Sequence, residues 1–130
     1  MIQILLPEAA SKAWQKAVEE ASEAQVLEVA GVAGPNLNGM YDYLDSQFSE
    51  GTAPVFQHQV NQEQFLYLAV DGRWHVGSEE AMRERTPDSR SRMHSDVVCP
   101  GVLPTLRGLG WHVFNRSSKE WEKQAAVKIS

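Results

Sequence analysis

Four arginines within ten positions are the side chains of this sequence best suited to bind a charged partner. They lie in residues 78–95, a stretch without sustained hydrophobic periodicity, and are Arg83, Arg85, Arg90 and Arg92. The planar guanidinium pairs well with carboxylates and phosphates, and a loop this long inside a compact domain is usually functional or disordered. We therefore expect an Arg-rich loop over 78–95 that contacts an acidic partner. A solvated connection without a binding role is the alternative.

Tryptophans are the second group that could recognise a ligand, because flat aromatic rings stack on other molecules. Of the four tryptophans, Trp14 and Trp74 are expected in the core from the helix and hairpin patterns below. Trp111 and Trp121 remain as candidate binding residues. They fit a protein contact, or alternatively a carbohydrate-binding or small hydrolytic domain. The cleft of such a domain would be lined by Trp111, Trp121, Tyr41 and a histidine.

Histidines could bind a metal or transfer protons, and the chain has four of them: His58, His75, His94 and His112. None has a partner at the spacing of a zinc motif, and no nucleophile-elbow, phosphate-loop or dinucleotide motif occurs. The similar segments Trp74-His-Val76 and Trp111-His-Val113 could place two histidines on one sheet face, with His58 as a third metal ligand. We expect hydrogen-bonded or exposed histidines instead, without metal or cofactor, and the sequence favours a non-enzymatic protein.

Charge and composition narrow the class of partner. The net charge of −5 argues against nucleic-acid binding. Residues 1–72 hold two basic and ten acidic side chains, whereas residues 73–130 hold ten basic and seven acidic ones. This uneven distribution suits a protein surface as partner, and self-association is compatible with it. No segment approaches the ~20 apolar residues of a membrane span. With one cysteine, Cys99, the default expectation is a reducing compartment, cytoplasmic or within an organelle.

A central β-hairpin is expected to position these groups. Residues 65–77 hold two β-prone runs around Asp71-Gly72, and Asp-Gly favours a two-residue type I′ turn. That turn would pair Ala69 with Trp74 and Tyr67 with Val76. One hairpin face would then be entirely apolar, with Phe65, Tyr67, Ala69, Trp74 and Val76. The other face is half apolar, so both faces need cover from the rest of the chain.

The remaining pattern predicts one domain over residues 1–130. Apolar residues at helical spacing after Pro7 indicate a helix over 7–23. Residues 26–77 and 97–129 are β-rich, with turns at glycine, proline and asparagine. We expect an α+β, mainly β fold, in which the N-terminal helix packs on a mostly antiparallel sheet of about six strands.

A family resemblance accompanies this pattern. Val29-Ala-Gly-Val-Ala-Gly-Pro-Asn-Leu-Asn-Gly-Met-Tyr41, followed by Pro54-Val-Phe56, the Trp74 hairpin and Leu109-Gly-Trp111, resembles a small β-rich module. Its outline is V-x-G-A-G, V-N-G-x-Y, P-x-[YF] and a late G-W, and it recurs in multidomain proteins of dinoflagellates, other protists and algae. No general activity is attached to that module. The resemblance, which covers about residues 26–129, therefore implies a non-catalytic interaction module or accessory subunit.

Overall fold

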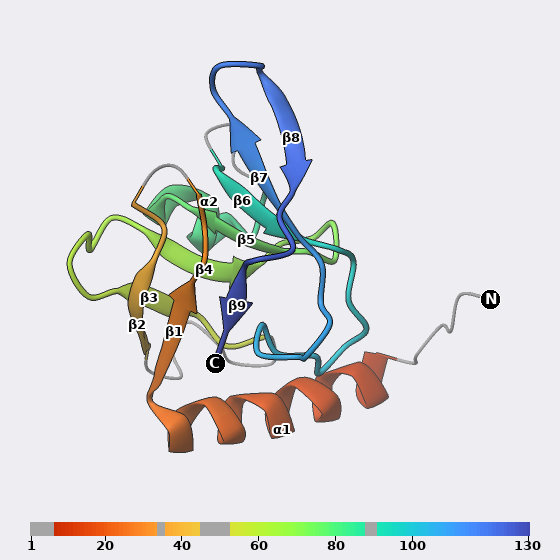
Figure 1. Ribbon diagram of the computed structural model, residues 1–130. Helices are drawn as coiled ribbons and strands as arrows, with labels where there is room; N and C mark the ends of the chain where they lie inside the picture. Colours follow the sequence, from red (N-terminus) through yellow and green to blue (C-terminus); the bar gives the residue numbers. More distant parts are fainter. Residues whose placement is uncertain (1–6, 34–35, 45–52, 88–90) are drawn as a thin grey trace.

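The computed structural model describes residues 7–33, 36–44, 53–87 and 91–130. Its described part contains two helices and nine strands, which form one sheet (Figure 1). In chain order they are α1 (Pro7–Ala24), β1 (Val26–Ala30), β2 (Gly39–Tyr43), β3 (Phe56–His58), β4 (Phe65–Leu68), β5 (Trp74–Gly77), α2 (Glu79–Glu84), β6 (Met93–Ser95), β7 (Trp111–Asn115), β8 (Glu120–Lys123) and β9 (Lys128–Ile129). None of these helices is long and apolar enough to cross a bilayer.

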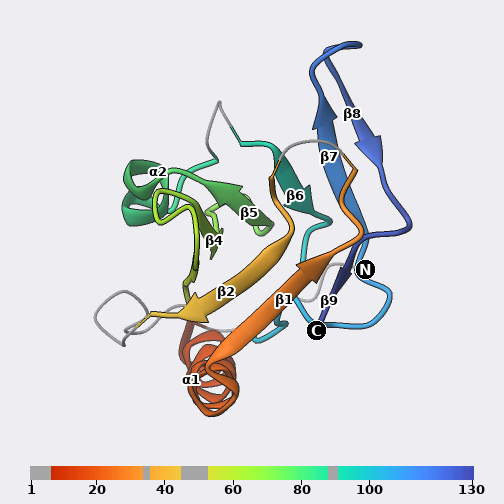
Figure 2. The same cartoon turned by 60° about the vertical axis from the view of Figure 1, so that its left-hand side comes forward.

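The sheet has the strand order β8-β7-β6-β5-β4-β3-β2-β1-β9, and neighbouring strands run antiparallel. It curls strongly, as Figure 2 shows. The predicted mainly β fold with an N-terminal helix on an antiparallel sheet is confirmed, but the predicted number of about six strands is too low. One extra strand, β6, forms inside the expected loop. The β-rich stretch expected over 97–129 ends in two separate strands, β8 and β9, because 128–129 pair with β1 at the opposite edge of the sheet from β8.

The N-terminal helix forms where its Ala-rich stripe predicts it. Trp14, Ala17 and Ala21 are buried, and the Trp14 and Trp74 rings pack in a T-shaped arrangement with a centroid distance of 6.1 Å. The helix ends at Ala24, and the next residue, Gln25, adopts a left-handed φ of 65° and donates its N–H to the Ala21 carbonyl. A left-handed residue with this 5→1 bond is a common helix C-terminal stop. The predicted span of 7–23 is thus confirmed to within one residue.

The β4–β5 hairpin exists, but its predicted register is wrong by one residue. Leu68 lies opposite Trp74 and Leu66 lies opposite Val76. A shift of one residue moves one strand's side chains to the other face relative to its partner. The face with Trp74 therefore carries Leu66 and Leu68, and Tyr67 lies on the face with His75.

The register differs from the predicted one because the loop has three residues rather than two. The connection is Val70-Asp71-Gly72, closed by hydrogen bonds of 3.0 Å from the Gly72 N–H to the Ala69 carbonyl and from the Ala69 N–H to the Arg73 carbonyl. Within it only Gly72 has a positive φ, 79°, whereas a type I′ turn needs two such residues. The connection is therefore a three-residue loop with one left-handed glycine rather than a type I′ turn.

Both faces of the hairpin are covered, as its composition predicts. Trp74 belongs to the larger core inside the curl, together with the apolar face of α1. Tyr67 belongs to a smaller core on the outer face, where Ala81 and Met82 of α2 cover it. Trp74 and Tyr67 are both completely buried, so the large rings of the hairpin serve packing on opposite sides of the sheet.

The prediction of one irregular Arg-rich loop over 78–95 is wrong for two segments. Residues 79–84 form α2, whose N-cap Ser78 accepts a hydrogen bond from the Ala81 N–H and whose C-cap Arg85 is left-handed. Residues 93–95 form β6 between β5 and β7. Elements of six and three residues are too short to show a hydrophobic period, and they form because tertiary packing and capping stabilise them.

Candidate functional site

The predicted arginines occupy different environments rather than one common surface. Arg83 is exposed on α2, and its Nη2 lies 3.0 Å from Oε1 of the equally exposed Glu79. Arg85 is half-buried and donates to the Ala53 carbonyl at 3.0 Å; burial lowers its pKa. Arg90 lies outside the described residues. Arg92, just before β6, lines a pocket.

The two candidate tryptophans face opposite sides of the sheet. Trp111 is only 3% exposed and packs in the inner core, so its predicted role as an exposed platform is wrong. It is buried because it shares the inward face of β7 with Val113. Trp121 is 42% exposed and lies opposite Phe114, on the outer face. Tyr41 is fully buried, so the aromatic cleft expected for a carbohydrate-binding or hydrolytic domain is not formed by these residues.

The pocket beside Arg92, which we call the Arg92 pocket, lies at one end of the curled sheet. Its volume is about 240 Å³. The β3–β4 turn, the end of β5, the residue before β6 and the segment before β2 all meet there, because antiparallel strands bring these chain positions to the same sheet end. Its lining residues are Leu37, Asn61, Glu63, Gln64, Val76, Gly77, Ser78 and Arg92.

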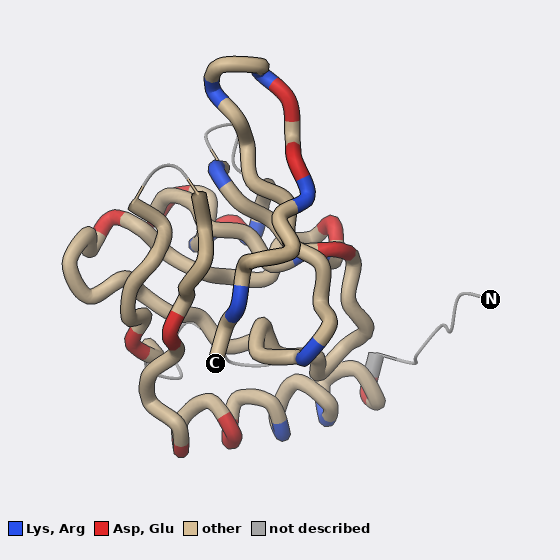
Figure 3. Tube along the Cα trace, viewed as in Figure 1, with Lys and Arg blue, Asp and Glu red and all other residues tan. Residues whose placement is uncertain are grey.

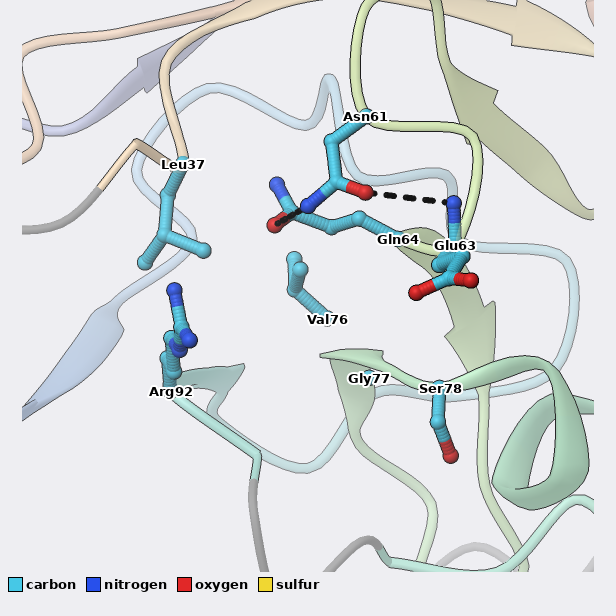
Figure 4. A pocket seen from close by; sticks show the side chains of 8 residues that line it. All are labelled: Leu37, Asn61, Glu63, Gln64, Val76, Gly77, Ser78 and Arg92. Carbon is cyan, nitrogen blue, oxygen red and sulfur yellow. Dashed lines mark hydrogen bonds between the residues drawn. The ribbon is translucent and has the colours of Figure 1, made fainter.

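Arg92 and Leu37 point toward each other on one side of the pocket (Figure 4). The side chains of Val76 and Gln64 lie between this pair and Glu63, which is on the other side. Leu37 and Val76 are 0% and 2% exposed, so they form an apolar floor. The main chain fixes the position of Arg92, because its carbonyl accepts a 2.9 Å bond from the Phe114 N–H. The pocket thus offers one guanidinium above an apolar base.

Hydrogen bonds hold the Gln64 side chain in place, and we call this side chain the amide wall of the pocket. Gln64 is buried and donates from Nε2 to the Tyr41 hydroxyl at 2.8 Å and to the Asn36 carbonyl at 3.2 Å. The Tyr41 hydroxyl in turn donates to the Leu37 carbonyl at 2.8 Å. Burial raises the pKa of Tyr41 to about 12, so the phenol stays protonated and keeps donating. This network connects residues 36–41 to the β3–β4 turn and sets the shape of the pocket before any ligand arrives.

The charges around the pocket are separated. Within the described ranges, no carboxylate lies at ion-pairing distance from Arg92, although three other pairs do form. Glu63 lies on the opposite side of the pocket. It is an exposed turn residue, and its own N–H donates to Asn61 Oδ1. A guanidinium without a nearby carboxylate is a ready binding group for an incoming anion.

A row of histidines forms a second polar feature, on the outer face of the sheet. His75 lies opposite His94, and His94 lies opposite His112, with ring centroids 5.5 and 5.2 Å apart. The similar Trp-His-Val segments thus do place His75 and His112 on one face. The third member is His94 rather than His58, whose Nδ1 accepts from two turn amides.

Each outer histidine of this row is held by a carboxylate. His75 Nε2 lies 2.9 Å from Asp71 Oδ2, and His112 Nε2 lies 2.8 Å from Asp96 Oδ1. The bond from His112 lowers the pKa of Asp96. The pKa of the central His94 is lowered, chiefly by burial and also by its charged neighbours. Across the described segments, no three His, Cys, Asp or Glu side chains are arranged to hold a metal ion.

Ser91, His75 and Asp71 form a hydrogen-bonded series of hydroxyl, imidazole and carboxylate, with Ser91 Oγ 3.3 Å from His75 Nδ1. Such a series activates a nucleophile in acyl-transfer enzymes. Here Ser91 is 5% exposed and donates to the Met93 carbonyl at 3.1 Å. The series therefore connects the β4–β5 loop to the start of β6 and serves structure.

No family model, curated protein or solved structure matches this chain. The choice of a candidate site therefore rests on the side chains and cavities described above. The histidine row is occupied by its own hydrogen bonds, whereas the Arg92 pocket combines open space with a charged group and a rigid wall. We take the Arg92 pocket as the candidate functional site.

Proposed function

We propose that this protein is a non-enzymatic protein-interaction module, or accessory subunit of a larger assembly, that binds an acidic group of its partner in the Arg92 pocket. One observation carries the proposal: the Arg92 guanidinium faces a pocket where the described residues place no carboxylate at ion-pairing distance. A carboxylate entering this pocket would gain charge-assisted hydrogen bonds that Arg92 does not make within the described chain.

The dimensions of the pocket favour a single acidic side chain. About 240 Å³ is below the usual range for drug-sized ligands, roughly 300–1,000 Å³. The methylene groups of a glutamate would contact Leu37 and Val76, while its carboxylate reaches Arg92. Glu63 across the pocket disfavours a doubly charged phosphate, because like charges repel. An acidic protein surface therefore fits better than a phosphate ligand.

Three further features support an interaction role. The β7–β8 hairpin projects from the body (Figure 1) and exposes Trp121, and exposed tryptophans often anchor protein contacts. The excess of basic residues after position 72 suits an acidic partner. The resemblance of residues 26–129 to a module with no general activity points the same way. The single Cys99 fits a reducing compartment, with the cytoplasm as the default.

Peptide titration tests the proposal. The probes are an acetylated, amidated hexapeptide with one central glutamate and the same peptide with glutamine. We expect the glutamate peptide to shift the amide resonances of residues 61–64 and 92, and Arg92→Ala to remove the effect. Arg83→Ala is the matched control and should leave binding unchanged. Equal binding of both peptides, or no effect of Arg92→Ala, would overturn the proposal.

A further inference from the structure

The last strand, β9, leaves one side of its backbone open. Glu28 and Ser130 exchange two backbone hydrogen bonds, of 2.8 and 3.0 Å. In an antiparallel ladder such pairs alternate with pairs that make no bonds to each other. Ile129, opposite Val29, therefore directs its N–H and C=O away from β1. In the described part of the chain no strand pairs with this outer edge.

A cleft of about 460 Å³ borders this edge, and its walls are residues 104–109 with Trp111 on one side and residues 125–130 on the other. The segment 104–109 passes beside β9 on the side away from β1 (Figures 1 and 2). The cleft is partly apolar. Leu106 is 53% exposed, and Leu109 and Val127 are partly buried against the inner core. The cleft therefore offers backbone hydrogen-bonding groups beside apolar contact surface.

The charged side chains that line the cleft are all basic. Arg107 and Lys128 are both exposed and lie on opposite walls. Figure 3 shows basic positions, in blue, on β9 and on the segment that passes beside it. The lining residues include no aspartate or glutamate. Such a cleft attracts negative charge and repels positive charge.

We propose that this cleft binds an extended acidic segment of a partner protein, which adds as a strand to the outer edge of β9. The main chain of the segment would bond to the N–H and C=O of Ile129, as in other strand-addition complexes. Alternate side chains would contact Leu109 and Val127, and acidic side chains between them would reach Arg107 and Lys128. This second surface is independent of the Arg92 pocket.

A second copy of the chain fits this surface less well. In a two-fold symmetric contact the same patch appears on both subunits. Arg107 and Lys128 would then face their own counterparts, and like charges would oppose the contact. An acidic segment from a different protein avoids that repulsion.

The test uses three acetylated, amidated hexapeptides with a fluorescent label. In the first, valine and glutamate alternate; in the second, valine and lysine alternate. The third repeats the first with methyl groups on its four central amide nitrogens, which removes backbone donors. Fluorescence anisotropy measures affinity, and amide chemical shifts of residues 126–130 locate the site. We expect only the unmethylated glutamate peptide to bind there, with at least about tenfold loss for the other two.

Charge-reversal variants complete the test. The double variant Arg107→Glu, Lys128→Glu should weaken the glutamate peptide at least about tenfold. The control Arg116→Glu, Lys119→Glu makes the same charge change at the tip of the β7–β8 hairpin and should have little effect, as should Arg92→Ala. The proposal is overturned if the methylated peptide binds equally well, if both double variants weaken binding alike, or if no peptide binds at millimolar concentration. Concentration-dependent dimerisation that is lost in Arg107→Glu, Lys128→Glu would instead assign the edge to a second copy.

Discussion

The two ends of the curled sheet are closed in different ways. At one end α1 and residues 99–104 make an apolar cover, in which Trp14 meets Trp74 and Gly101 passes close to Ala13. At the other end the cover is polar, with Gln64 hydrogen-bonded to Tyr41 beside the Arg92 pocket. The first end removes apolar surface from water and stabilises the fold. The second satisfies its own hydrogen bonds and leaves the Arg92 side chain beside an open pocket.

The largest expected effect falls on the apolar end. Trp74→Ala should destabilise the fold by about 3–5 kcal/mol, because it removes a fully buried ring and leaves a cavity. It also removes the donor of the 2.9 Å bond from Trp74 Nε1 to the Val102 carbonyl. Urea denaturation measures the change. Trp121→Ala, at a ring that is 42% exposed, is the control and should cost clearly less. Equal losses would contradict the inner core as the main source of stability.

At the polar end, removal of a single hydroxyl oxygen should lower the free energy of unfolding. Tyr41→Phe leaves a buried Gln64 donor and the Leu37 carbonyl short of a partner, which costs about 1–3 kcal/mol. Tyr43→Phe is the matched control on the same strand and should change the unfolding free energy by less than about 0.5 kcal/mol. Chemical denaturation of both variants decides the matter. A neutral Tyr41→Phe would show that the amide wall is not a rigid support.

The histidine row gives the fold a dependence on pH. Folding lowers the pKa of His94 below its ordinary 6.5, so the unfolded chain takes up this proton more readily. The contribution of His94 is complete above pH 6.5 and is lost as pH falls below that value. The lowered pKa of Asp96 adds a separate loss below its ordinary 3.8.

His94→Phe tests this dependence while keeping a ring against Trp121, whose centroid lies 4.3 Å from His94. The urea midpoint of the variant should fall less between pH 7.5 and pH 5 than that of the original chain. An unchanged slope would mean that other groups cause the loss.

The smallest expected effects on stability concern Arg83 and Arg92, whose substitutions should differ in peptide binding but not in stability. Arg83→Ala removes one exposed ion pair, and such pairs contribute about 0–1 kcal/mol. Arg92→Ala removes no ion pair within the described residues. Both thermal midpoints should lie close to that of the original chain, and only Arg92→Ala should lose the glutamate peptide. A large destabilisation by Arg92→Ala would place Arg92 among the structural residues.

Local signals predicted the elements better than their pairing. The helix followed from Pro7 and the Ala-rich stripe, since both act within one element. The hairpin followed from two β-prone runs, but its register depends on the φ of Asp71, and Asp-Gly permits more than one loop. Strand β6 was missed because three residues carry no period, and its place is set by β5 and β7 on either side.

The candidate site was predictable only in part. Arg92 was named because guanidinium chemistry is visible in sequence. Its companions Leu37, Asn61 and Gln64 come from two distant segments, and nothing in their spacing indicates that they meet. For the histidine row, the two Trp-His-Val segments indicated His75 and His112, whereas His94 lies in a stretch without pattern. Sequence chemistry thus identifies single groups, and the sheet order decides which of them become neighbours.

The loop at Val70–Gly72 has a consequence for how this chain reaches its native state. A nascent ribbon that closed through the two-residue bend favoured by Asp71-Gly72 would turn the indole of Trp74 toward the side where His75 belongs. The two strands of such a hairpin must separate before the core can form. The local turn preference of Asp71-Gly72 therefore conflicts with the register that the folded protein requires. Asp71→Asn, which strengthens the local preference, would prolong that misregistered intermediate and delay refolding.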